Sequence, residues 1–203
     1  VDHRLFKPRS KEKARKRLCL SGSFIILTVR RLVYKNGINF LIDAFVKFNK
    51  ENQDSKLIIV GKGPDKSGIE SIVKRKGLNN SVILTGFVPD DILPFYYNAS
   101  DVFVLPSVPG EGFPLTVLEA FASGIPVITT KCGGVIEIVD NEINGFVVPP
   151  FSSERIYEKL KLLHKNFRMC KELGFNGRKL IEKSFTWDFH IKKLLNIYKE
   201  LIK

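Results

Sequence analysis

The sequence of 203 residues has few of the features that mark secreted, metal-binding or membrane-spanning proteins. Its three cysteines, Cys19, Cys132 and Cys170, have no C-x-x-C spacing, which argues against a disulfide framework or a cysteine zinc site. The longest apolar runs, such as that from Phe24 to Val29, fall far short of the roughly 18 residues that span a bilayer. No cluster of His, Asp and Glu has metal-ligand spacing, so we expect no metal. We expect a globular protein of the reducing cytoplasm.

Charge of one sign is concentrated at the two ends of the chain. Residues 1–17 hold eight Lys and Arg against two acids, and residues 151–203 hold thirteen against six, whereas residues 18–150 are nearly neutral, with twelve against thirteen. The total of +12 would suit nucleic acid or an anionic membrane surface, but the unusual motifs lie in the neutral middle. We interpret residues 7–17 as a solvated linker, with a phosphate- or membrane-contacting arm as the alternative.

Short apolar runs alternate with amphipathic segments from residue 24 onward. The helical segments are expected at about 38–53, 66–77, 90–98, 115–124 and 135–140. Continuous apolarity implies that both faces of the strands are covered. This alternation predicts an α/β fold with a doubly wound, Rossmann-like, six-stranded parallel sheet. The runs are FIILTV at 24–29, KLIIV at 56–60, SVILT at 81–85, VFVL at 102–105, PVITT at 126–130 and GFVV at 145–148.

A helical extension is expected after Pro150. Its last helix has Thr186 as a plausible N-cap and an apolar stripe that includes Ile191, Leu194 and Tyr198. A stripe of this kind has to pack on something.

The loop after the fourth run leads into a helix that should begin near Leu115. Pro114 suits the first helical position, and the amides of Leu115 and Thr116 would then offer a place for an anion. Glu111 and Glu119 flank this helix start. Two acids would repel an anion unless they bind hydroxyls, so the pattern points to a ligand with both a diphosphate and a sugar. The alternative is that both are ordinary loop and surface carboxylates.

Cations follow the first two runs. Arg30, Arg31 and Lys35 come after the first and Lys62 after the second, at one predicted edge of the sheet, where they would offset diphosphate charge. We interpret Gly61 and Gly63 as part of a tight turn between strand and helix. A third glycine is missing, and no acid ends the second run, which disfavours a dinucleotide-dependent hydride transfer.

Six segments resemble, in order, successive signatures of the retaining family 4 glycosyltransferases. That family has two Rossmann-like domains facing across a cleft. The resemblance implies that residues 23–203 are the carboxyl-terminal, donor-binding domain, preceded by a basic linker at 1–22, with the acceptor-binding domain absent from this chain. The segments are RLVYKNG at 31–37, VGKGP at 60–64, ASDVFVLPS at 99–107, the run from Glu111 through Glu119 to Val127, GGVIE at 133–137 and NGFVVP at 144–149.

The resemblance also implies roles. Glu119 would bind the nucleotide ribose, Glu111 the hydroxyls of the transferred sugar, and Arg31 the diphosphate, where it would stabilise the leaving group. The family's diphosphate-binding lysine position is Asn36 here, and Lys35 lies one residue earlier. Either Lys35 reaches inward to bind the diphosphate, or diphosphate binding is weakened. The implied catalytic residues are therefore Glu111, Arg31 and Lys35.

Further donor-binding positions follow from the same motifs. The base would be lined by the third-strand loop, largely through its backbone, and a glycine turn after the fifth strand would face the donor, although a plain turn is an equal alternative. No metal or other cofactor is implied, and the donor would be a UDP-, GDP- or ADP-sugar. The positions are Gly37, Phe87, Val88, Gly112, Phe113, Leu115, Thr116, Gly133 and Gly134.

The main hypothesis is a glycosyltransferase that moves a hexose-type sugar with retention of configuration, of which this chain is the donor-binding half. Its acceptor, a sugar or a lipid-linked sugar, would be held by the missing amino-terminal domain, so the chain alone should have little activity. A peripheral contact with the inner membrane surface is also expected, and no nucleic acid. The alternatives are a non-catalytic nucleotide-sugar-binding module and a basic protein that binds nucleic acid or anionic membrane.

Overall fold

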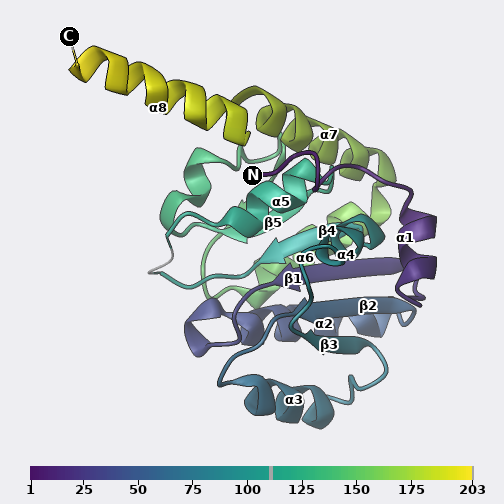
Figure 1. Cartoon of the computed structure of the whole chain (residues 1–203). Coiled ribbons are helices and arrows are strands. Elements are labelled where there is room, and N and C mark those ends of the chain that lie inside the picture. Colours follow the sequence, from purple (N-terminus) through teal and green to yellow (C-terminus); the bar gives the residue numbers. More distant parts are fainter. Residues whose placement is uncertain (110–111, 203) are drawn as a thin grey trace.

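A six-stranded, all-parallel sheet with helices on both faces forms the centre of the molecule (Figure 1). The computed structural model describes residues 1–109 and 112–202. The strand order is β3-β2-β1-β4-β5-β6, so the chain order reverses between β1 and β4. The predicted doubly wound fold is confirmed. The strands are β1 (Phe24–Val29), β2 (Ser55–Val60), β3 (Val82–Gly86), β4 (Val102–Leu105), β5 (Val127–Thr130) and β6 (Gly145–Val148).

Strand β1 shows why the apolar runs are continuous. Its side chains alternate between the faces, as in any strand. Phe24 and Ile26 pack into the core on one side, and Ile25, Leu27 and Val29 pack into the core on the other. All six residues of β1 are buried, because helices cover both faces.

Two helical layers supply those cores. One face of the sheet is packed by α2, α3 and α6, and the other mainly by α4, α5 and the carboxyl-terminal part of α7. The helices are α1 (Lys11–Arg17), α2 (Ile38–Glu51), α3 (Lys66–Arg75), α4 (Leu93–Ala99), α5 (Leu115–Ala122), α6 (Ser153–Lys165), α7 (Phe167–Ser184) and α8 (Trp187–Leu201), and two short 3₁₀ turns are η1 (Tyr34–Asn36) and η2 (Gly133–Glu137).

Several boundaries differ from expectation. The segment expected as a helix at 135–140 is instead η2, a 3₁₀ turn that begins at Gly133. Pro114 occupies the N-cap position of α5 rather than its first helical position, although the helix does begin at Leu115 as predicted. The helix before β4 begins only at Leu93, since Asp90, Asp91 and Ile92 form a turn.

The basic opening of the chain is not a solvated linker. Residues 11–17 form α1, which packs against α4. Its Arg15 donates to the Asp101 carboxylate at 2.7 Å and to the carbonyl of Ala99 at 2.9 Å. Lys11 also donates to Asp101, at 2.5 Å, and the Ile25 amide donates to the same carboxylate at 2.7 Å. Several of these cations therefore hold the fold together at the edge where the strands begin.

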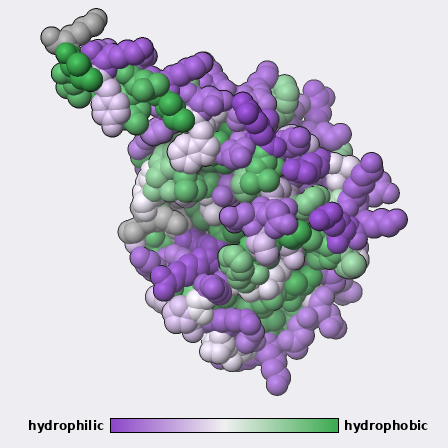
Figure 2. Space-filling view, viewed as in Figure 1, coloured by the Kyte–Doolittle hydropathy of each residue, from purple (hydrophilic) through white to green (hydrophobic). Residues whose placement is uncertain are grey.

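Helix α8 projects from the body of the molecule (Figure 1). Thr186 caps it as predicted, accepting a hydrogen bond from the Phe189 amide at 3.1 Å. None of its residues is buried, and apolar side chains show along it in Figure 2, so the described part of the chain does not cover its stripe. None of the described helices combines the length and the apolarity that crossing a membrane would require.

Candidate functional site

The predicted site residues follow strands β1, β3, β4 and β5, at the edge where these strands end. In open α/β sheets the ligand crevice lies at this edge, at the point where strand order reverses. Here that point lies between β1 and β4, so the loops that follow these two strands flank it.

These two loops are joined by backbone contacts. The Val108 amide donates to the Lys35 carbonyl at 3.3 Å. Gly37 has a φ of 69°, and a Cβ at this position would lie 1.9 Å from the Pro106 carbonyl oxygen. Only glycine fits there. The loop that carries Arg31 and Lys35 is therefore held directly against the loop that leads to α5.

Asn36, which stands where the resembling family has a lysine, is part of the scaffold of its loop. Its side-chain amide donates to the Arg31 carbonyl at 2.5 Å, which ties residues 31 and 36 together. Arg31 and Lys35 are exposed, and no described residue forms an ion pair with either. Lys35 is thus the cation that this loop offers beside Arg31.

Glu119 is held from behind by a tyrosine. It lies on α5, and its Oε2 accepts a hydrogen bond from the Tyr97 hydroxyl at 2.7 Å. Tyr97 lies on α4 and is fully buried, and its hydroxyl is also 3.4 Å from the Thr116 carbonyl. Burial raises the pKa of the Glu119 carboxyl above its usual value, and the Tyr97 hydrogen bond opposes this rise. Glu119 is consequently a fixed acceptor rather than a mobile surface residue.

The start of α5 leaves backbone donors open. Leu115, its first residue, is exposed and Thr116 is half-buried, and no side chain caps the helix there. Helix amides without partners are a favourable place for an anion. Glu111, the other predicted acid, lies outside the described residues.

The glycine turn after β5 meets the segment before α5. The Gly134 amide donates to the Gly112 carbonyl at 3.2 Å, and a Cβ at Gly134 would lie 2.8 Å from the ring of Phe113. Gly133 has a φ of 54° and begins η2. The structure thus brings together two segments that lie about twenty residues apart in the sequence.

The loop after β3 presents one residue and buries the next. Phe87 is 66% exposed, and Lys62 lies over its ring at 5.2 Å. Val88 is buried among the apolar side chains of α4 and α5, so only its backbone can face a ligand. The expectation that this loop lines a base, mainly by its backbone, remains a prediction for both Phe87 and Val88.

Two contributors were missed by sequence reasoning. Tyr97 lies in an apolar helical segment and is indistinguishable there from a core aromatic. Arg30 was noted only as a cation, but it is buried and donates to the Ser107 hydroxyl at 2.9 Å, so it joins the ends of β1 and β4. An arginine directly after a buried strand was the signal that could have been used.

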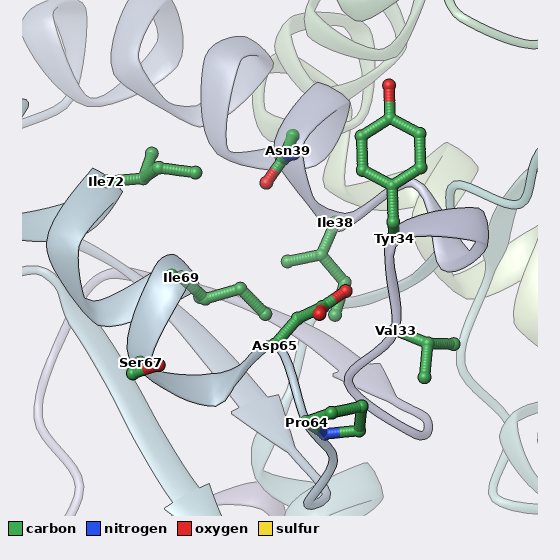
Figure 3. A pocket seen from close by; sticks show the side chains of 10 residues that line it. Val33, Tyr34, Ile38, Asn39, Pro64, Asp65, Ser67, Ile69 and Ile72 are labelled. Atoms are coloured by element: carbon green, nitrogen blue, oxygen red, sulfur yellow. The ribbon is translucent and has the colours of Figure 1, made fainter.

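Two cavities lie beside these residues. One, of about 370 Å³, lies between the loop after β1 and the start of α3. Figure 3 shows Asp65 amid the apolar side chains of Ile38 and Ile69, with Tyr34 at the side. None of the predicted site residues lines it. The other, of about 420 Å³, is lined by Phe113 and Leu115 together with residues 184–187 at the start of α8. In the described ranges there is no cluster of His, Cys, Asp and Glu suited to a metal.

The fold, with its strand order reversing between β1 and β4, defines a Rossmann-like domain of the kind found in glycosyltransferases. A sequence model of the family described as glycosyl transferases group 1 matches residues 10–180. The chain therefore belongs to this family.

Individual relatives agree with the assignment. An uncharacterized glycosyltransferase of Methanocaldococcus jannaschii is 34% identical over 175 residues, which are 86% of this chain and 44% of the relative. A GDP-mannose-dependent alpha-(1-6)-phosphatidylinositol monomannoside mannosyltransferase of Mycobacterium tuberculosis is 29% identical over 193 residues, 92% of this chain and 50% of the relative. The chain thus spans about half the length of these curated relatives.

A solved structure is similar over its whole length. It is the C-terminal domain of a group 1 glycosyl transferase from Francisella tularensis, with 30% identity and a TM-score of 0.86, covering 92% of this chain and 99% of that one.

Proposed function

We propose that this chain is the donor-binding half of a retaining glycosyltransferase of the family 4 type, which transfers a hexose-type sugar from a nucleotide-diphosphate sugar to an acceptor. The observation that carries the proposal is Glu119, a carboxylate fixed by Tyr97 on the helix that starts beside the switch point. A fixed carboxylate with free lone pairs is suited to accept hydrogen bonds from ribose hydroxyls.

The diphosphate would lie between two groups of donors. Arg31 and Lys35 supply charge from the loop after β1, and the amides of Leu115 and Thr116 supply the positive end of α5. As the bond from sugar to diphosphate breaks, negative charge grows on the diphosphate oxygens, and these donors stabilise it. Glu111 would bind hydroxyls of the transferred sugar, and the same-face departure and attack would leave the anomeric configuration unchanged.

The acceptor belongs to the part of the relatives that this chain does not span. We propose a sugar or a lipid-linked sugar as acceptor, and the name of the Mycobacterium tuberculosis relative, a phosphatidylinositol monomannoside mannosyltransferase, supports the lipid-linked form. Positioning of two substrates requires both halves, so we expect slow turnover from this chain alone. The three cysteines are unpaired, which supports a cytoplasmic location.

Calorimetry with UDP, GDP, ADP and their sugars tests the donor assignment. Glu119→Ala should weaken binding of the preferred nucleotide on the order of tenfold or more, because a charge-assisted hydrogen bond is lost. Glu70→Ala, which removes an exposed carboxylate on α3, is the control and should leave binding unchanged. If Glu119→Ala left the nucleotide affinity unchanged, the assignment of Glu119 to the ribose would be wrong.

Retention and catalysis need a separate test. With the partner half restored, the anomeric configuration of the product should match that of the donor, as read by proton NMR of the first turnovers. Full nucleotide binding without any transfer by the two-domain protein would favour the non-catalytic module instead.

A further inference from the structure

A third cavity lies at the opposite edge of the sheet, where β4 and β5 begin. Its volume is about 330 Å³, and we call it the amino-edge pocket. The proposed donor site makes no use of it. Four segments line it: the chain before α1 with Pro8, Arg9 and Lys11, the link from α4 to β4 with Asn98 and Asp101, the link from α5 to β5 at residues 123–126, and the first turn of α7 with Phe167, Cys170 and Lys171.

The lining of this pocket is electropositive. Three basic residues, Arg9, Lys11 and Lys171, line it together with a single acid, Asp101, and the Arg9 guanidinium also donates to the Leu5 carbonyl at 2.9 Å. That acid is already matched, since it accepts from Lys11 at 2.5 Å, from Arg15 at 2.7 Å and from a backbone amide. It therefore adds little repulsion for an incoming anion.

Neither the Cys170 thiol nor helix α7, which both contribute to the lining, repels an anion. Burial raises the pKa of the Cys170 thiol to about 11, so this group carries no charge near neutral pH. Helix α7 begins at Phe167, so the positive end of its dipole lies at the pocket.

One buried polar group in the wall lacks a partner. Ser123 is 3% exposed, and among the described residues its hydroxyl has no hydrogen-bond partner. Buried hydroxyls are nearly always hydrogen-bonded, so the Ser123 hydroxyl, which is closed to solvent, is an unused donor in the wall that a bound oxyanion would engage after a small local movement. Pro8, Ile125 and Phe167 make apolar parts of the wall, and the Asn98 side chain in it is already hydrogen-bonded to backbone groups.

We propose that the amino-edge pocket binds a phosphate group carried by an organic molecule with an apolar part. Two sources share this chemistry, a phosphate ester free in solution and the headgroup of an anionic phospholipid. The surrounding surface is compatible with either, because the basic beginning of the chain forms α1 beside the pocket. Figure 2 shows hydrophilic side chains projecting on the side where Figure 1 places α1.

The chain offers a matched pair of lysines for the test. Lys171 lies over the ring of Phe167 at 4.6 Å, and Lys179 lies over the ring of Phe175 at 4.4 Å, on the same helix. Both are exposed, and only Lys171 lines the pocket. Lys171→Glu and Lys179→Glu therefore change the charge by the same amount, and each removes one lysine–ring contact. The first change lies in the pocket lining and the second lies outside it.

Binding of inorganic phosphate and of glycerol phosphate is measured by calorimetry on the full chain. Arg31→Ala is the background, which weakens phosphate binding at the proposed diphosphate site; any phosphate still bound there is common to both lysine variants and cancels in their comparison. We expect saturable binding that Lys171→Glu weakens about tenfold and Lys179→Glu changes less than about twofold. If a glutamate variant does not fold, Lys171→Gln and Lys179→Gln give the same contrast.

Sedimentation with vesicles separates the two sources. Preference for phosphatidylglycerol over phosphatidylcholine vesicles, lost with Lys171→Glu and kept with Lys179→Glu, supports the lipid headgroup. Saturable phosphate binding without that preference supports the free ester. Equal effects of the two lysine variants, or no saturable binding to any of these probes, would overturn the proposal and leave the donor site untouched.

Discussion

The two edges of the sheet use similar residues in opposite ways. Where the strands begin, the Asp101 carboxylate is surrounded by Lys11, Arg15 and a backbone amide. Where they end, Arg31 and Lys35 face outward without an ion-pair partner in the part of the chain that the structure describes. A matched charge stabilises the fold, and an unmatched charge at a sheet edge is available to a ligand. Charge composition alone does not separate these two uses, since residues of both kinds count equally toward the +12 total.

Asp101→Ala tests the edge where the strands begin and should have the largest effect on stability. It leaves the largely buried Arg15 without its counter-charge and the Ile25 amide without an acceptor, which we expect to cost about 3 kcal/mol of unfolding free energy. Urea unfolding measures this. Asp43→Ala, which removes an exposed pair with Lys76, should cost less than about 0.5 kcal/mol. If both variants lost the same unfolding free energy, the Asp101 contacts would contribute no more to stability than an exposed surface pair.

Gly37→Ala tests the edge where the strands end. The added Cβ would meet the Pro106 carbonyl and strain a positive φ, so we expect a loss of about 2 kcal/mol together with weaker nucleotide binding. Gly68→Ala is the contrasting change, because no atom lies within 4 Å of its added Cβ in α3. That variant should gain about 0.5 kcal/mol in thermal or urea unfolding. A harmless Gly37→Ala would mean that the two loops are not held as described.

Tyr97→Phe tests how Glu119 is fixed, with a smaller effect on stability, of about 1 kcal/mol. Loss of the hydroxyl removes a group that stabilises the ionised carboxylate, so the pKa of Glu119 should rise further. Nucleotide binding should weaken several-fold, and the pH below which it is lost should move upward. Tyr96→Phe, at the neighbouring position, is the control for calorimetry across pH. Identical pH profiles for both variants would show that Tyr97 only fills space.

Glu119→Gln should give the smallest change in stability, visible only as a pH dependence of the unfolding free energy. The folded-state pKa of Glu119 is raised, so between the unfolded and the folded pKa the folded protein binds more protons, and stability falls as pH rises through that window. The glutamine side chain of the variant cannot ionise. The difference in unfolding free energy, variant minus parent, should therefore grow between about pH 4 and pH 7. A difference that shrinks over this range would contradict the sign of the shift.

The architecture was largely predictable, because it depends on local pattern. The six apolar runs located six strands to within about one residue, since β-branched and apolar residues in short runs have few alternatives in an α/β chain. The start of α5 and the Thr186 cap follow from single-residue preferences. The 3₁₀ turn η2 could not be separated from a helix by apolar spacing alone.

The site was predictable in part. The motif pattern selected Glu119, Arg31 and Lys35 as candidates, and their roles remain predictions, but it gave no sign of the contacts that surround them. Tyr97 and Glu119 are 22 positions apart, and Arg15 and Asp101 are 86 apart, so each pairing depends on how helices dock. Spacing also could not show that the Asn36 amide is used within its own loop. These are tertiary contacts, and one sequence carries no direct signal of them.

Helix α8 has a practical consequence for anyone who handles these 203 residues as a soluble sample. Its exposed apolar stripe, which includes Ile191, Leu194 and Leu195, should bind hydrophobic dyes and detergent micelles. The same stripe should cause self-association as the protein concentration increases. Crystals or spectra obtained at millimolar concentration would then show α8 in contact with a second molecule of the protein. Dilution series belong in every binding titration of the chain.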